Sequence, residues 1–90
     1  MIELRDVQRG GPFGTWGARL YWRGVLVHVL RSYGSEAYLH RCAHDWAKQM
    51  CVDRDLADGS RQTPDRLRAW AVQYGSLRAD CGGEAVYAAA

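Results

Sequence analysis

Four side chains between positions 40 and 51 are of types that bind metal ions: His40, Cys42, His44 and Cys51. On a helix, His40 and His44 lie one turn apart and could reach the same ion. Cys42 would point to the opposite side of that helix, and Cys51 would lie about 10 Å further along the axis. Because a protein metal site needs at least three ligands, we predict no metal site here, only two histidines beside an apolar stripe.

Other patterns associated with catalysis are incomplete. The acidic residues Asp53, Asp55 and Asp58 do not have the spacing of a calcium loop, and Pro64 stands where the bidentate glutamate would be. The glycine-rich stretch 10–14 lacks the lysine and hydroxyl residue that end a phosphate-binding loop. No serine or cysteine lies in a motif that would supply a base and an orienting carboxylate. We therefore predict no catalytic residue, no cofactor and no enzymatic activity.

A basic sheet face is the strongest candidate for binding. Alternation from Trp16 to Trp22 places apolar residues on one face of a strand, and polar residues with a tyrosine on the other. The predicted interaction surface consists of Arg5, Arg9, Arg19, Tyr21, Arg23 and His28. Arg and Tyr are enriched at protein and nucleic-acid contacts, but they are also common on solvated sheet faces. The sequence leaves both interpretations open.

Three strands are expected to carry these side chains, over residues 2–9, 16–22 and 25–30. The glycine-rich loop 10–14 separates the first two, and Arg23-Gly24 forms a tight turn between the others, in which Gly24 takes a positive φ. Matching apolar to apolar residues across that turn predicts one register. It pairs Trp22 with Val25, Leu20 with Val27, Ala18 with Val29, and Arg19 with His28.

Two helices are expected to follow. Ser35 is a good N-cap for a helix ending near Met50 or Cys51, and Thr63-Pro64-Asp65 opens the second, which Gly75 ends. The apolar stripe of the first helix is Leu39, Cys42, Ala43, Trp46, Ala47 and Met50. That of the second is Leu67, Trp70, Ala71 and Tyr74. We expect Trp46, Leu39 and Met50 to pack against Trp22, Leu20 and Val27, and all four tryptophans to be buried.

The predicted fold is α+β: a three-stranded antiparallel sheet packed on one amphipathic helix, with a second C-terminal helix closing an edge (βββαα). One domain is expected over 1–90, with a sheet over 2–34, a helix over 35–51, a connector over 52–62, a helix over 63–75 and a tail over 76–90. The tail either adds a short strand or frays.

Composition excludes several classes of protein. The chain has 90 residues, a net charge of +2 and 48% apolar residues, which is too hydrophobic for a disordered chain. No apolar run approaches the roughly 20 residues that span a membrane, and no secretory signal is apparent. Three cysteines without a C-x-x-C pair favour reduced thiols. We therefore expect a cytoplasmic protein with no membrane partner; its oligomeric state is left open.

Part of the sequence resembles a family of DNA-binding domains. Gly14-Thr-Trp16-Gly-Ala18-Arg-Leu20, then Gly24, then Tyr33-Gly-Ser35-Glu36-Ala37 with Ala43 and Ala47, is similar to the three-strand-plus-helix domains of plant ethylene-response factors and of the arm-binding ends of phage integrases. In those domains, residues on the sheet face read the major groove of DNA. The resemblance covers about residues 14–47, and it assigns this role to Arg19, Tyr21 and Arg23.

A second resemblance is one of type. A compact, arginine-rich chain of this length without a catalytic signature looks like the small phage-encoded inhibitors of host defence, including anti-CRISPR proteins. This resemblance implies a non-catalytic protein that docks on a nuclease or a crRNA-guided surveillance complex in the host cytoplasm. The alternative function is a small DNA-binding protein that uses the basic face of its sheet.

Overall fold

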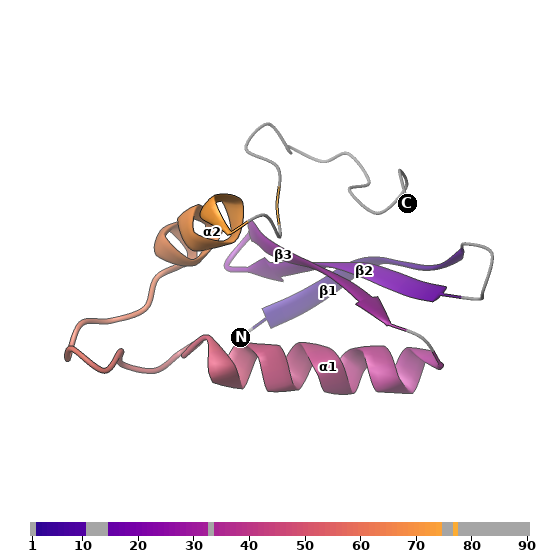
Figure 1. The fold of residues 1–90 in the computed structure, drawn as a ribbon, viewed down its shortest axis with the longest axis horizontal. Coiled ribbons are helices and arrows are strands. Elements are labelled where there is room, and N and C mark those ends of the chain that lie inside the picture. Colours follow the sequence, from indigo (N-terminus) through magenta and orange to yellow (C-terminus); the bar gives the residue numbers. More distant parts are fainter. Residues whose placement is uncertain (1, 11–14, 33, 75–76, 78–90) are drawn as a thin grey trace.

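The chain folds into a three-stranded antiparallel sheet with one helix on each side (Figure 1). The computed structural model describes residues 2–10, 15–32, 34–74 and 77. The strands are β1 (Ile2–Gly10), β2 (Thr15–Trp22) and β3 (Val25–Ser32), in that order across the sheet. The helices are α1 (Glu36–Gln49) and α2 (Pro64–Gln73). This arrangement confirms the predicted α+β class and the order βββαα.

The turn between β2 and β3 confirms the predicted hairpin. Arg23 and Gly24 both have positive φ, 50° and 79°, which is the geometry of a type I′ turn. This turn matches the right-handed twist of the two strands that it joins. Trp22 and Val25 pair directly beside it, as predicted.

Beyond the turn, the predicted register is wrong by one residue. A bulge in β3 leaves Val27 as the extra residue, so that Leu20 pairs with His28 and Arg19 with Val29. Five of the six residues from Val25 to Leu30 are apolar, so alternation alone could not specify the register of β3. Leu26 and Val27 are both buried, in two different core clusters, and the bulge places His28 opposite the core residue Leu20.

A second irregularity lies in β1. Arg5 pairs with Arg19, but the next pair joins Gln8 to Gly17. Between them, Asp6 adopts a φ of 55°, a left-handed conformation that is uncommon for residues other than glycine and more frequent for aspartate and asparagine. The irregularity changes the direction of β1 and carries the Asp6 side chain toward β2, where it meets Arg19.

The main core lies between the sheet and α1. Ser35 caps α1 by accepting a hydrogen bond from the Tyr38 backbone N–H at 3.2 Å, as predicted. Leu39 and Ala43 are buried, and Trp46 and Met50 pack against the same cluster as Leu20, Trp22 and Val27. The predicted packing of α1 on the sheet is therefore confirmed.

The second helix lies across β3 and is oriented differently from the prediction. Thr63 caps it by accepting from the Arg66 backbone N–H at 3.2 Å, as expected. Leu67 and Ala71 are buried, but Trp70 is 39% exposed and Tyr74 is 65% exposed. The predicted stripe is thus wrong in two of its four members.

Two predictions concern residues outside the described part of the chain. They are that Gly75 ends α2 and that the tail over 76–90 adds a strand or frays; of these residues only Leu77 is described. Leu77 is buried, and its N–H donates to the Ala71 carbonyl at 3.1 Å. It joins Leu26 and Ala71 in a second, smaller core cluster on the sheet face opposite α1.

Candidate functional site

The sheet face opposite α1 is here called the outer face. Two of the six predicted interaction residues, Arg5 and Tyr21, lie on it next to each other, as expected. Arg5 is exposed, and its guanidinium carbon lies 4.5 Å from the centroid of the Tyr21 ring. Arg5 also donates to Glu3 at 3.0 Å. The hydrogen bond and charge of Arg5 hold the pKa of Glu3 below its usual value. Arg5 is thus already engaged with an acidic and an aromatic neighbour.

The predicted exposure of Arg19 is wrong. Arg19 is only 7% exposed, and its guanidinium donates to the Asp6 carboxylate at 3.0 Å. Strand parity does place Arg19 on the outer face, but the irregularity in β1 brings the Asp6 carboxylate to it. A buried arginine already paired with an aspartate is not available to a partner.

His28 is the second correction, because the bulge in β3 turns it toward α1. Its imidazole stacks on the Trp46 indole, with ring centroids 4.6 Å apart and an interplanar angle of 6°. Burial lowers the pKa of His28 to about 4, so the ring is neutral at physiological pH. The buried Nδ1 of His28 has no hydrogen-bond partner among the described residues. His28 belongs to the packing of α1 and not to a basic outer face.

Arg23 and Arg9 lie at opposite ends of the sheet. Arg23 is in the hairpin turn, exposed, and 4.0 Å from the Asp53 carboxylate. Arg9 is exposed near the end of β1. The six predicted residues therefore do not form one surface, and three of the four arginines among them lie beside acids. Paired arginines have less positive charge to offer phosphates.

An exposed aromatic pair on α2 was missed from the sequence. The rings of Trp70 and Tyr74 lie 5.1 Å apart at an angle of 40°, one turn from each other on the solvent side of the helix. The place beside β3 is taken instead by Arg68, which donates to the Leu26 carbonyl at 3.0 Å. The sequence did hold a signal for this orientation of α2. Arg68 lies one turn before Val72, and a long arginine side chain can cover the edge of a strand in place of an aromatic ring.

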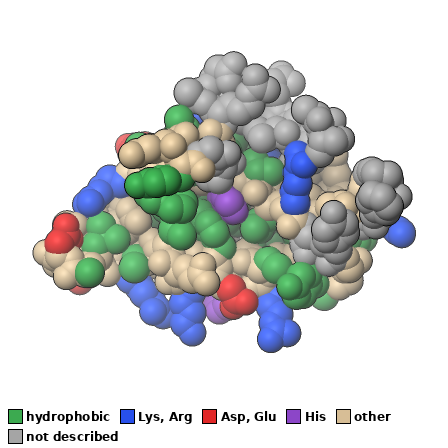
Figure 2. Space-filling view, in the orientation of Figure 1, with side chains coloured by type: hydrophobic (Ala, Val, Ile, Leu, Met, Phe, Trp, Pro, Cys, Tyr) green, Lys and Arg blue, Asp and Glu red, His purple; other side chains and the backbone are tan. Residues whose placement is uncertain are grey.

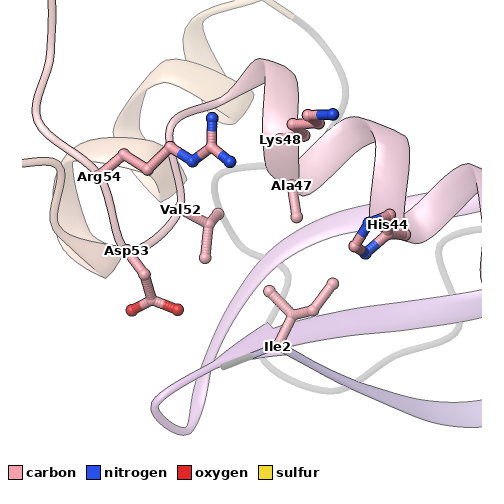
Figure 3. Close-up of a pocket in the computed structure, with 7 residues that line it drawn as sticks. All are labelled: Ile2, His44, Ala47, Lys48, Val52, Asp53 and Arg54. Carbon is pink, nitrogen blue, oxygen red and sulfur yellow. The ribbon is translucent and has the colours of Figure 1, made fainter.

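A groove lies where the end of α1 passes the start of β1 (Figure 3). Its volume is about 390 Å³. The lining residues are Ile2, His44, Ala47, Lys48, Val52, Asp53 and Arg54. They come from β1, from the last turns of α1 and from the chain that follows α1. The groove therefore has an apolar floor and charged walls.

Other kinds of site were also sought. Within the described ranges, no three His, Cys, Asp or Glu side chains are grouped so that they could hold a metal ion. His40 and His44 are exposed, and His40 lies 3.7 Å from Glu36. None of the helices in the described part of the chain has the length and hydrophobicity to cross a membrane.

Comparisons with known proteins add no family assignment. The sequence matches no protein-family model, and searches of curated proteins and of solved structures gave no match. The function must therefore be argued from the side chains themselves.

Proposed function

We propose that this protein is a non-catalytic binding protein that docks on a protein partner through the aromatic pair on α2, here called the α2 face. The single observation that carries the proposal is the exposure of Trp70 and Tyr74 beside each other, 39% and 65% of their surfaces being open to solvent. Trp and Tyr are the residues most enriched at the energetic centres of protein interfaces.

The surroundings of the pair support a preformed surface. Thr63 and Pro64 hold the start of α2, and Leu67 and Ala71 anchor its buried side against the sheet. An aromatic pair on an anchored helix loses little backbone conformational entropy on binding, because the helix already fixes the backbone.

Protein binding is favoured over DNA binding by the state of the arginines. A DNA-binding sheet would present unpaired cations to the phosphates and base edges. Arg5, Arg19 and Arg23 instead lie 3.0, 3.0 and 4.0 Å from acidic side chains. DNA binding is therefore the competing outcome of the test below.

The partner class is part of the same proposal. The resemblance in size and composition to small phage-encoded inhibitors supports a host nuclease or a crRNA-guided surveillance complex as the target, and the host cytoplasm as the place of action. A surface aromatic pair on a small α+β fold is compatible with inhibition by docking alone.

The test compares two exposed aromatic sites in the full chain. Purified surveillance complexes and nucleases, and any partner captured by crosslinking in a bacterial host, are titrated with the wild type and with Trp70→Ala, Tyr74→Ala and Tyr38→Ala. Tyr38 is the matched control, a tyrosine on α1 that is 52% exposed. We expect Trp70→Ala to weaken binding by about thirtyfold or more, which corresponds to about 2 kcal/mol. Tyr38→Ala should leave binding unchanged.

Two results would contradict the proposal. One is a partner that binds the wild type and the Trp70→Ala variant equally well. The other is DNA binding in a gel-shift assay, with an affinity that falls by about a thousandfold from low to physiological salt, as expected for a protein that contacts six or more phosphates.

A further inference from the structure

The groove between α1 and β1 is a second surface, separate from the α2 face and independent of the function proposed above. Its floor is built from the way in which α1 ends. The Val52 N–H donates to the Ala47 carbonyl at 3.0 Å, and the Cys51 N–H donates to the Lys48 carbonyl at 3.4 Å. This pair of bonds is a Schellman motif, in which Cys51 holds the left-handed position with a φ of 59°. Because the motif brings Val52 against Ala47, the chain leaves the helix with an apolar surface beside Ile2.

The capping bonds also satisfy carbonyls at the negative end of the helix dipole. Carbonyls in the last turn of a helix normally carry a partial negative charge that repels anions. Here the Trp46, Ala47 and Lys48 carbonyls all accept backbone N–H groups, and the Met50 carbonyl accepts from the Gln62 side chain at 3.0 Å. These four carbonyls are therefore turned to protein donors at the end of α1.

Two of the side chains that line the groove are cations that project to solvent. Within the described part of the chain, neither Lys48 nor Arg54 makes an ion pair or a side-chain hydrogen bond, and both are exposed. In Figure 3, Lys48 lies above Ala47 on α1 and extends outward, and Arg54 lies above Val52 on the chain that follows α1. Figure 2 shows Lys and Arg side chains along the edge of the molecule that α1 forms.

Asp53, the acidic residue of the groove, does not pair with Lys48 or Arg54. Asp53 points away from Lys48 and Arg54, on the opposite side of the groove (Figure 3). Its carboxylate lies 4.0 Å from the Arg23 guanidinium in the hairpin turn. His44 adds a hydrogen-bonding imidazole at the far end of the floor.

We propose that this groove binds a peptide segment of another protein in which an acidic side chain adjoins an apolar one. The apolar side chain lies on Ala47, Val52 and Ile2, and the carboxylate pairs with Lys48 and Arg54. An apolar floor beside two cations distinguishes such a segment from a bare anion, which gains nothing from the floor, and from a neutral apolar segment, which gains nothing from the cations.

The experiment is a titration of the full chain with defined peptides, followed by two-dimensional NMR of the backbone amides. The probe is an acetylated, amidated tetrapeptide of alternating glutamate and leucine. Its controls are the same peptide with glutamine in place of glutamate, and inorganic phosphate. We expect the acidic peptide to cause saturable shifts of the Ala47, Lys48 and Val52 amides, and the glutamine peptide to bind about tenfold more weakly.

Matched variants then separate the two halves of the groove. Lys48→Gln with Arg54→Gln should weaken the acidic peptide by about tenfold, whereas Arg41→Gln, an exposed arginine of α1 outside the groove, should have no effect. Val52→Thr, which keeps the shape of the floor and makes it polar, should weaken binding by about threefold. The amide spectrum of each variant shows whether it is folded.

Three outcomes would overturn this proposal. They are the absence of saturable shifts around the groove, equal binding of the acidic and glutamine peptides, and phosphate that produces the same shifts and competes with the peptide. None of them bears on the α2 face, because Trp70 and Tyr74 do not line the groove.

Discussion

The two faces of the sheet are built on different principles. On one face, α1 covers all three strands with a continuous apolar stripe, and the largest buried side chains, Trp22, Leu20 and Leu39, meet there. On the outer face, the buried cluster is small and consists of Leu26, Ala71 and Leu77. Toward β1, that face carries charged pairs such as Arg19 with Asp6.

This difference separates stability from recognition. The α1 side buries enough apolar surface to dominate folding, since burial stabilises in proportion to area. The second helix, α2, uses a narrow stripe, in which Leu67 joins the main core and Ala71 joins the outer cluster, and Trp70 and Tyr74 remain exposed. The α2 face accordingly lies outside the main core, and the groove lies at the rim of that core, where Ile2 and Val52 pack against it.

The largest expected effect comes from making the same substitution, leucine to alanine, on each face of the sheet. Leu39→Ala, at a fully buried position of α1, should lower the free energy of unfolding by about 4 kcal/mol. Leu26→Ala, at a position 3% exposed on the outer face, should lower it by about 2 kcal/mol, because a smaller cluster collapses more easily around the lost atoms. Denaturant titration measures both values. Equal losses would show that the two faces contribute alike.

The next effect concerns the imidazole that the bulge places on the α1 side. The pKa of His28 is about 4 in the fold and near 6.5 in the unfolded chain, so the unfolded chain takes up the proton first as the pH falls. The stability due to neutral His28 is therefore complete above about pH 6.5 and is lost as the pH falls toward 4, by up to about 3 kcal/mol.

A pair of variants isolates this histidine from the other groups that titrate in acid. His28→Phe keeps a ring against Trp46 and should remove most of the loss between pH 6.5 and 4. His40→Gln, at an exposed histidine of α1, should retain it. Urea unfolding across this pH range supplies the measurement, and an unchanged profile for His28→Phe would place the ring in solvent.

The smallest effect tests whether the end of α1 is optimised for stability. Cys51 has a φ of 59° at the position where a Schellman motif favours glycine. Cys51→Gly should raise the free energy of unfolding by about 1 kcal/mol, since a left-handed conformation is costly for residues with a Cβ. Thermal unfolding with a reductant present would show the gain, and a loss would mean that the half-buried thiol contributes more than the strain costs.

The sequence by itself determined the order of the elements and where the two helices begin. Ser35 and Thr63 cap the two helices as predicted, and Arg23-Gly24 forms the hairpin turn. The stripe of α1 was also correct. These features depend on hydrogen bonds and side-chain spacing within a few residues of each other, so they can be predicted without knowing which distant segments pack against them.

Only the tertiary structure decided which side chains reach solvent. A run of apolar residues in β3 fits more than one register, and the bulge that turns His28 inward goes with its pairing to Leu20 and its stacking on Trp46, both distant in sequence. Arg19 is buried because β1 bends and brings Asp6 to it, across 13 positions of sequence. Trp70 and Tyr74 are exposed because α2 lies over a single strand, where Leu67, Arg68 and Ala71 suffice to cover it. In each case the outcome depends on contacts between segments that are distant in sequence, and a local pattern of residue types does not predict such contacts.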